Sequence, residues 1–277
     1  MMTAIFPSRS SLLVTKTLVC VLFGFFTSTT VASDWKEVTS GLSVRTDQIA
    51  VGASGQNVEI NALLINPSLL RTKVVAVHNT INRQKLKFPT YSLRELARVV
   101  RPIAIVNGGF SSSYTLPLPS GLLIENQRTI AVINDISKTQ SGVLCIGDKK
   151  VQILTRAEYK TVQCKDALQS GPLLVEGAGK VGVFQSEHKK LPWYRRSFIA
   201  VRQDGQVILG VAGEISLYDL ALYIAATGPK GGLGAVRALN LSGDVESGLY
   251  YSNDGTRLQT YGNMDAPIAS AIAVVRY

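Results

Sequence analysis

Three segments of the sequence place glycine and small polar residues directly after a short apolar run. They are Asn107-Gly108-Gly109-Phe110, Gln169-Ser170-Gly171-Pro172, and Asn240-Leu241-Ser242-Gly243-Asp244 with Glu246 and Ser247. Glycine at the end of a strand lets the backbone turn sharply and approach a ligand closely. Loops of this kind, gathered at one rim of a sheet, form polar ligand-binding clefts. Each segment taken alone is more typical of an ordinary turn, so the prediction depends on all three meeting.

A glycine pattern typical of dinucleotide sites occurs at Gly177-Ala-Gly179-Lys-Val-Gly182. A pyrophosphate site requires that such glycines open a helix. The residues from Val181 to Phe184 instead have the pattern of a strand. We therefore predict a hairpin turn here and no bound dinucleotide.

Other common catalytic centres find no support in the sequence. A Gly-x-Ser-x-Gly nucleophile elbow is absent, and the two histidines, His78 and His188, lie far apart without a partner motif. Zinc sites of the usual kinds require clustered His or Cys, which excludes them here. We predict no cofactor and assign no metal ligands. Carboxylates alone suffice to bind calcium, so a divalent cation stays an open alternative.

The chain between these loops is predicted to form mostly short strands. Alternating or apolar runs bounded by turn residues favour strands at 57–65, 71–77, 103–106, 121–125, 129–133, 142–146, 151–154, 168–175, 198–202, 206–211, 238–241 and 268–275. Helices are predicted at 92–100 and 216–226, with Ser92 and Ser216 as N-caps. Many strands with few helices indicate an α+β fold. Without a repeat or linker, we expect a single domain over 34–277 with mixed, strand-rich sheets.

The N-terminal 33 residues have the pattern of a secretory signal peptide. Arg9 and Lys16 precede an apolar run from Leu18 to Phe26, and small or polar residues follow as far as Ser33. The apolar run is much shorter than the roughly 20 residues that a membrane-spanning helix needs. We therefore predict export to the periplasm or the medium, with no stable membrane span after the signal is cleaved.

The chain is basic, with a formal net charge of +10 that becomes +8 once the two cations of the leader are removed. The cations are scattered, and only Lys189-Lys190 with Arg195-Arg196 form a local cluster. Nucleic-acid binding usually requires a basic patch or a recognisable module. We find neither and predict no nucleic-acid partner.

Two cysteines, Cys145 and Cys164, remain after the leader. In an oxidising compartment they could form one disulfide, which would stabilise the fold by a few kcal/mol. Two buried free thiols are an equally good interpretation, and the sequence leaves both open.

Five short blocks occur along the chain in one order and together resemble a known family. They are Asn107-Gly-Gly-Phe, Pro119-x-Gly121-Leu122 with Glu125, Gln169-Ser-Gly-Pro-Leu-Leu-Val, Arg196-Ser-Phe-Ile-Ala-Val and Ala238-Leu-Asn-Leu-x-Gly243. This order resembles the phosphodiester glycosidase family, whose domain is shared by bacterial exported proteins and the lysosomal mannose-6-phosphate uncovering enzyme. The resemblance covers roughly residues 60–277, most of the mature chain.

The resemblance implies an exported hydrolase that cleaves the glycosidic bond of a sugar-1-phosphodiester, such as a phosphorylated envelope glycan or exopolysaccharide. It also implies an α+β fold with the motif loops around one cleft. By position, the substrate-binding residues would be Asn107, Gly108, Gly109, Ser170, Gly171 and Arg196. An arginine suits this role because its guanidinium matches a phosphate bidentately.

One block departs from the family pattern. Where the family usually has Leu-Asp-Gly-Gly-x-Ser-Ser, this chain has Leu241-Ser-Gly-Asp-Val-Glu-Ser247. Glycosidic cleavage is commonly aided by two carboxyl groups, and the candidate catalytic carboxyls are Glu125, Asp244 and Glu246. Either Asp244 or Glu246 replaces the missing aspartate, or the site has lost its usual chemistry.

Alternatives to the enzyme hypothesis remain. Arg196 has the pattern of a surface ion pair as much as of a phosphate ligand, and Glu246 has that of a solvated loop acid. The altered segment and the basic surface favour, as a rival, a carbohydrate- or phosphate-binding envelope protein without turnover. A third possibility is a structural envelope protein whose loops are only turns.

Overall fold

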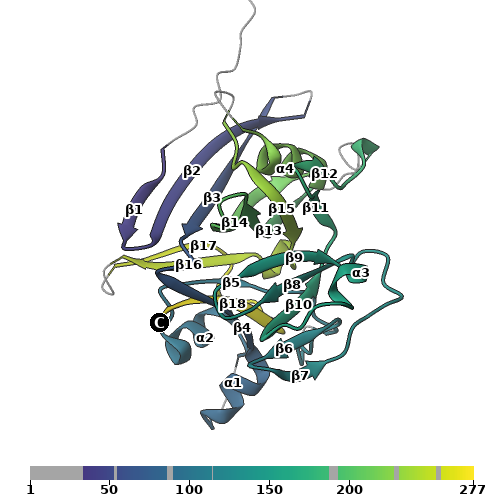
Figure 1. Cartoon of the computed structure of the whole chain (residues 1–277). Coiled ribbons are helices and arrows are strands. Elements are labelled where there is room, and N and C mark those ends of the chain that lie inside the picture. The colour runs from purple at the N-terminus through teal and green to yellow at the C-terminus, as the bar shows by residue number, and fades with distance from the viewer. Residues whose placement is uncertain are drawn as a thin grey trace, which may run out of the picture.

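A computed structural model describes residues 34–52, 55–85, 90–113, 115–186, 193–227, 231–253 and 257–277. The predicted leader and the Lys189-Lys190 pair lie outside the described residues. The described part consists of three sheets and a few helices (Figure 1). None of its helices is both long enough and apolar enough to span a membrane.

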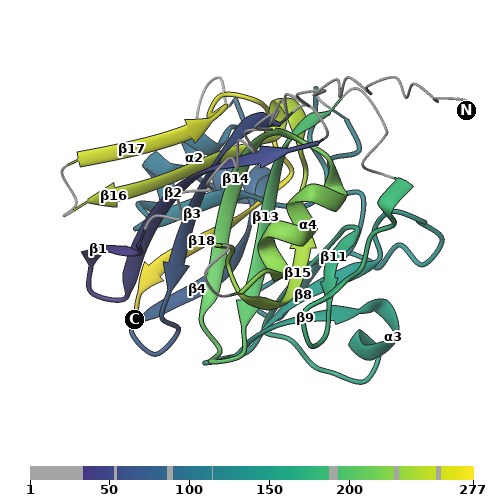
Figure 2. The same ribbon diagram turned by 90° about the horizontal axis from the view of Figure 1, so that it is seen from above.

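An eight-stranded sheet is the largest element of the fold. Its strands, in spatial order, are β1 (Lys36–Thr39), β2 (Leu42–Val51), β3 (Gln56–Ile65), β14 (Val207–Ile215), β13 (Tyr194–Arg202), β15 (Ala235–Asn240), β11 (Leu173–Glu176) and β12 (Lys180–Val181). Helix α4 (Leu217–Ala225) packs against one face of this sheet, over β13, β15 and β11 (Figure 2). Ser216 caps α4 by accepting a hydrogen bond from the Asp219 backbone N–H at 3.0 Å, as predicted.

Two five-stranded sheets complete the strand layers. One contains β7 (Arg128–Ala131), β6 (Leu123–Glu125), β10 (Asp166–Ser170), β8 (Gly142–Ile146) and β9 (Val151–Thr155), in that spatial order. The other contains β17 (Arg257–Gly262), β16 (Gly248–Asn253), β5 (Ala104–Asn107), β18 (Ser270–Arg276) and β4 (Leu70–Ala76). Every strand pair in the described residues is antiparallel. The expected mixture of parallel and antiparallel pairs is therefore wrong. A parallel pair would require a crossover connection between its two strands.

The main core lies where the three sheets meet. Its buried side chains come from all three: Ile199 and Leu239 from the eight-stranded sheet, Val106 and Ile272 from the sheet of β5, and Leu168 from the sheet of β10. Helices α1 (Val77–Arg83) and α2 (Leu93–Val100) cover the outer face of the β5 sheet, on the side of the molecule away from α4 (Figure 1). The short helix α3 (Arg156–Tyr159) follows β9.

Most predicted elements are present, with shifts at their ends. Helix α2 begins at the predicted cap, where Ser92 accepts a hydrogen bond from the Glu95 backbone N–H at 3.3 Å. The pattern at Gly177–Gly182 is a hairpin, as predicted, in which β11 pairs with β12. The predicted strand at 168–175 is instead two strands, because the chain leaves β10 at Ser170 and enters β11 at Leu173 in another sheet. Among the described strands and α-helices, six were not predicted, namely β1, β2, α1, α3, β16 and β17.

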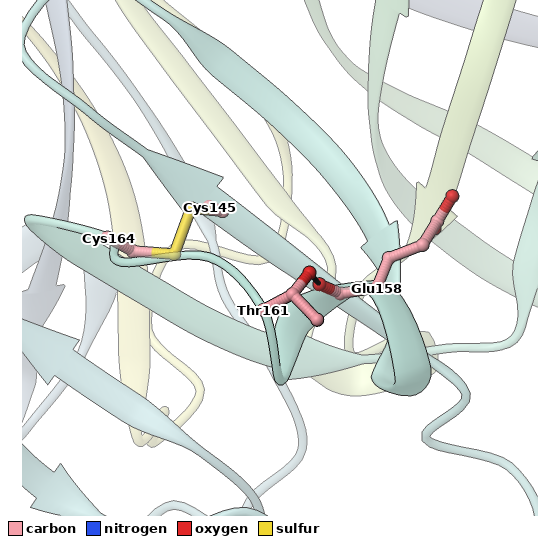
Figure 3. The surroundings of a disulfide bond; sticks show 4 residues. All are labelled: Cys145, Glu158, Thr161 and Cys164. Atoms are coloured by element: carbon pink, nitrogen blue, oxygen red, sulfur yellow. Dashed lines mark hydrogen bonds between the residues drawn. A yellow bond between two sulfur atoms is a disulfide. The ribbon is translucent and has the colours of Figure 1, made fainter.

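The cysteine pair is a disulfide. Cys145 lies in β8, Cys164 precedes β10, and their Cα atoms are 5.3 Å apart, within the range that a disulfide requires (Figure 3). In the same connection the Thr161 hydroxyl donates to the Glu158 carbonyl at 2.9 Å. By the loop-entropy relation, closing a loop of this length stabilises the fold by about 3 kcal/mol.

Candidate active site

The buried side chain of Asn107 ties together three of the motif segments. Its amide nitrogen donates to the Ser242 carbonyl at 2.7 Å. Its amide oxygen accepts from the Ser197 hydroxyl at 2.7 Å and from the Gly248 backbone N–H at 3.1 Å. The end of β5 is thus bound to β13, to the turn after β15 and to the start of β16. Because Asn107 already makes three bonds within the protein, its geometry is that of a positioning residue more than of a free donor to a sugar.

The Gly108-Gly109 turn is fixed by close packing. A Cβ atom on Gly108 would lie 2.3 Å from the Ser270 hydroxyl, and one on Gly109 would lie 2.6 Å from the Gln169 carbonyl oxygen. Only glycine permits such an approach. The Gly109 N–H donates to the Ser270 hydroxyl at 3.1 Å. This turn therefore brings the first predicted segment into contact with the second.

The Ser170-Gly171 segment lies between the sheets and touches the end of β15. The Gly171 carbonyl accepts from the Asn240 side-chain amide at 2.9 Å, and the Gly171–Pro172 peptide bond is cis. A Cβ atom on Gly171 would lie 2.1 Å from the Thr139 carbonyl oxygen. Ser170 is fully buried, and its hydroxyl has no hydrogen-bond partner among the described residues. The three predicted segments thus meet at one place.

The turn after β15 carries a buried carboxyl group at this junction. The Ser242 backbone N–H donates to the Gly108 carbonyl at 2.9 Å, and the Ser242 hydroxyl makes a short hydrogen bond to the Glu246 carboxyl. Glu246 lies in a single 3-10 turn, Asp244–Glu246, and is 4% exposed. Burial raises the pKa of Glu246, while hydrogen bonds from Ser242 and Ser111 oppose that rise. Glu246 therefore holds a proton to higher pH than an ordinary glutamate.

The other two candidate carboxyls have different environments. Asp244 is exposed on the same turn, with a left-handed backbone at φ 54°. Glu125, at the end of β6, accepts from the Ala76 N–H at 3.3 Å and lies 3.6 Å from the Arg83 guanidinium. Ala76 is the N-cap residue of α1, and its own side chain makes no capping bond. Glu125 thus serves the start of α1, and its contacts are there instead of at the Glu246 turn.

Arg196 approaches the Glu246 turn from the other face of β13. Successive side chains of a strand point to opposite faces, so Arg196 points away from the side on which Ser197 meets Asn107. Its Nη1 atom lies 3.8 Å from where a Gly243 Cβ would be, and its Nε donates to the Ile215 carbonyl at 3.3 Å. Its Cζ atom is 5.3 Å from the centre of the Tyr194 ring. The guanidinium is therefore beside the turn that carries Asp244 and Glu246.

Several serines of this junction were not predicted. Ser197 orients Asn107, Ser242 and Ser111 bind Glu246, and Ser270 holds Gly109. The available signal was a polar residue inside or beside an apolar strand, as Ser197 and Ser270 are. Within the described ranges, no group of three or more His, Cys, Asp or Glu side chains is placed to hold a metal ion.

This chain is similar to known proteins both in sequence and in fold. The sequence profile of the phosphodiester glycosidase family matches residues 101–275, which run from the residue after α2 nearly to the end of β18. A search of curated protein sequences gave no significant match.

Solved structures give two further likenesses. The catalytic domain of zebrafish N-acetylglucosamine-1-phosphodiester alpha-N-acetylglucosaminidase, auto-inhibited by its pro-peptide, superposes with a TM-score of 0.65 at 12% identity, covering 90% of this chain and 88% of that one. A hypothetical protein from Synechocystis superposes with a TM-score of 0.57 at 17% identity over 89% of this chain, which spans only 64% of that protein. At such identities the likeness establishes a shared fold. The family profile matches more than half of the sequence, and on that match the chain belongs to the phosphodiester glycosidase family.

Proposed function

We propose that this protein is an exported glycoside hydrolase that cleaves the glycosidic bond of a sugar-1-phosphodiester, with Glu246 as its acid–base residue. The observation that carries the proposal is the hydrogen bond from the Ser242 hydroxyl to the buried Glu246 carboxyl. Ser242 occupies the position where the family pattern has aspartate. The Glu246 side chain therefore reaches back along the turn and supplies a carboxyl group next to that position.

The chemistry that this carboxyl can perform follows from its environment. A buried glutamate with a raised pKa is suited to give a proton to a leaving group and to take one from water. In the proposed reaction the bond between the anomeric carbon and the phosphate oxygen breaks. Water supplies a hydroxyl group to that carbon and a proton to the phosphate. The products are the free sugar and a phosphate monoester.

Two other side chains have roles in the proposal. Arg196 binds the phosphate, because a guanidinium compensates the negative charge that stays on the leaving group. Asp244 is the second carboxylate and would have to turn from its exposed position toward the positive charge that develops on the sugar ring. Asn107, Gly108, Gly109, Ser170 and Gly171 hold the surrounding loops in place. Glu125 has no role here, because its carboxylate is engaged at α1.

The experiment measures release of free sugar from a panel of sugar-1-phosphodiesters by the purified protein. Glu246→Gln keeps the size of the side chain and removes its acid–base function, so we expect kcat to fall by about 100-fold or more, the usual range for such a residue. Asp244→Asn serves as the matched control on the same turn, with an expected smaller effect. Unchanged turnover in Glu246→Gln would rule out the assigned role.

One observation favours a binding function without turnover. Only one of the three candidate carboxyls, Glu246, is buried at the junction, whereas glycosidases commonly use two carboxyl groups. If the protein binds sugar-1-phosphodiesters but releases no sugar, this second function replaces the first. In that case Ser242→Asp, which restores the family residue, tests whether the missing aspartate is the cause.

A further inference from the structure

A pair of adjoining hollows runs along α2, on the side of the molecule away from α4. Their volumes are about 330 and 480 Å³, and both are lined by Ala97, Arg101 and Tyr250. Hollows of this size each accommodate a small ligand such as one sugar with its phosphate. We refer to the two together as the arginine groove, defined by Arg94, Arg98, Arg101, Arg276, Tyr250, Ser252 and Met264.

The charge of the arginine groove has a single sign. Arg94 and Arg98 are four residues apart on α2 and so lie on one face of it. Arg101, the C-cap residue of α2, lines the same hollow as they do. Arg276 joins them from the end of β18. No acidic residue is among the described residues that line the two hollows. Arg94 is paired with a carboxylate outside the lining, since its Nε lies 2.6 Å from Asp265, and the same carboxylate interacts at longer range with Arg98.

Neutral side chains in the arginine groove are suited to a sugar ring. Tyr250 is half-buried and lines both hollows, and Met264, which is 4% exposed, forms part of the wall of the larger one. Ser252, which lines the smaller hollow, is 8% exposed, and its hydroxyl interacts with the phenol of Tyr250. These two side chains therefore form a polar edge beside the apolar surface of the hollow.

Helix electrostatics explain only part of this group of arginines. Cations near the C-terminus of a helix are favourable, which accounts for Arg98 in the last turn of α2 and Arg101 at its C-cap. Arg94 in the first turn and Arg276 on β18 are not explained in this way.

A second basic hollow, of about 550 Å³, differs from the arginine groove because acidic side chains balance the charge of its arginines. There Arg237 is 2.9 Å from Glu158 and Arg202 is 4.0 Å from Asp204, so its arginines are already paired. The arginine groove keeps its surplus of positive charge.

The arginine groove is connected to the candidate active site through β16. This strand starts at Gly248, directly after the turn that carries Glu246, and then brings Tyr250 and Ser252 to the groove. Gly248 also packs against α2, because a Cβ atom there would lie 3.1 Å from Leu93. A polymer that extends from the Glu246 turn along β16 would therefore meet the arginine groove.

We propose that the arginine groove is an accessory site that binds the chain of a phosphorylated glycan, with guanidinium groups on its phosphates and Tyr250 and Met264 against its sugars. The choice of a glycan rests on the proposed function, and the requirement for phosphate rests on the groove alone. The accessory site raises the affinity for a polymeric substrate and takes no part in bond cleavage.

Binding is measured by calorimetry with a glycan oligomer whose sugars are joined by phosphodiesters, using the Glu246→Gln protein so that the probe stays intact. The test variant adds Arg98→Gln and Arg101→Asn. Asparagine is chosen because Arg101 has a left-handed backbone with φ 51°, which asparagine tolerates. Lys149→Gln with Lys150→Gln removes the same charge from the second basic hollow and is the matched control. We expect at least a tenfold loss of affinity in the test variant and less than a twofold loss in the control.

Other outcomes would overturn the proposal. An equal loss in the control would mean that only net charge matters. Undiminished binding of the dephosphorylated oligomer would remove the role of the arginines. Binding of anionic phospholipid vesicles with the same dependence on Arg98 and Arg101 would assign the groove to a membrane surface.

A separate measurement distinguishes this proposal from the proposed function. With Glu246 intact, the Arg98→Gln/Arg101→Asn variant is expected to hydrolyse a single sugar-1-phosphodiester at the unaltered rate, since such a substrate is too short to reach the groove. If neither protein hydrolyses it, the proposed function fails while the calorimetric result stands. A slower rate in the variant alone would contradict the accessory role.

Discussion

Two clusters of buried polar side chains in this protein surround a carboxyl group in opposite ways. Beneath α4, Asp47 of β2 lies 2.7 Å from the Arg45 guanidinium and accepts a hydrogen bond from the Tyr223 hydroxyl. Arg45 also donates to the Gly232 carbonyl at 3.0 Å. Burial and the hydrogen bond to Asp47 raise the pKa of Tyr223, so its phenol stays protonated. The charge of Asp47 is matched by a cation.

The Glu246 turn is equally buried, yet hydroxyl groups take the place of a cation. The hydrogen bonds to its carboxyl come from Ser242 and Ser111. Hydroxyl groups stabilise the charged form less than a guanidinium does, which leaves desolvation as the largest influence on the pKa of Glu246. This carboxyl is suited to exchanging a proton, whereas that of Asp47 is suited to holding the fold together.

The two clusters also differ in how regular the backbone around them is. Arg45 and Asp47 lie within a regular ten-residue strand, and Tyr223 lies within a helix. Glu246 lies in a turn among strand ends that glycines allow to approach closely. Burial of a charge therefore does not by itself mark a functional site. What distinguishes a site is a buried carboxyl without a cation, placed where loops meet.

The largest expected effect is from Asp47→Ala. This change leaves the Arg45 guanidinium buried without its carboxylate, and breaking a buried pair in this way costs about 3–5 kcal/mol. Urea unfolding should show that loss in the free energy of unfolding. The catalytic rate per folded molecule should stay unchanged, because the cluster is structural. A stability loss below about 1 kcal/mol, the value of an exposed pair, would contradict the comparison.

A double variant separates the loss of the pair from the cost of an isolated charge. Arg45→Met with Asp47→Leu replaces both ions by apolar groups of similar size. Such replacements are often neutral or stabilising, so this protein should be markedly more stable than Asp47→Ala. Equal destabilisation of the two variants would mean that the ion pair itself carries the stability.

Glu246→Gln should change stability in the opposite direction. Because burial raises the folded pKa of Glu246 above its ordinary value of 4.5, the folded state binds the proton more tightly than the unfolded state does. Its contribution to stability is therefore complete below pH 4.5 and is lost as pH rises through the folded pKa. A glutamine has no charge to desolvate, so at pH 8 we expect a gain in the free energy of unfolding, by about 1.4 kcal/mol for each pH unit by which burial raises the pKa of Glu246.

The measurement is the free energy of unfolding between pH 4 and pH 8. Relative to the variant, the unmodified protein should lose stability as pH rises across this interval. Asp244→Asn, an exposed change on the same turn, should leave the profile unaltered. If the unmodified protein instead gains stability with pH relative to Glu246→Gln, then Glu246 is held in its charged form and the contrast with Asp47 fails.

A smaller effect is expected from Ser242→Ala. The Ser242 hydroxyl lowers the pKa of Glu246 by donating a hydrogen bond to its charged form. Its removal should raise that pKa further. If Glu246 acts as the acid, the alkaline limb of the pH–rate profile moves to higher pH. A shift downward would show that Ser242 does not donate to the charged form.

The smallest effect is expected from Ser170→Ala. The buried Ser170 hydroxyl has no partner among the described residues, so removing it should be neutral or stabilising by about 1 kcal/mol. Ser197→Ala is the matched comparison, because the Ser197 hydroxyl donates to Asn107 at 2.7 Å. Its loss should cost about 1–3 kcal/mol. Thermal unfolding of both variants distinguishes them, and equal losses would mean that Ser170 has a partner after all.

Prediction from the sequence succeeded where the determinants are local. Ser92 and Ser216 cap α2 and α4 as expected, because an N-cap needs only the next turn of chain. Helix α1 was missed because its cap residue, Ala76, makes no side-chain bond and Glu125 supplies the acceptor from another sheet. Strand β2 was missed because it carries Arg45 and Asp47 on a buried face. Both misses involve partners that are distant along the chain.

The strand-rich composition, the glycine-rich strand ends and the family resemblance, which the profile match supports, can be recognised in the sequence. Which acid is buried cannot be recognised there, because it depends on the tertiary structure. Asp244 and Glu246 are two residues apart on one turn, and only Glu246 faces inward. The tertiary structure also shows that Cys145 and Cys164 form a disulfide, whereas the sequence left a disulfide and two free thiols equally open. Burial and pairing depend on contacts between segments far apart in the chain, whereas capping and strand periodicity depend on neighbouring residues.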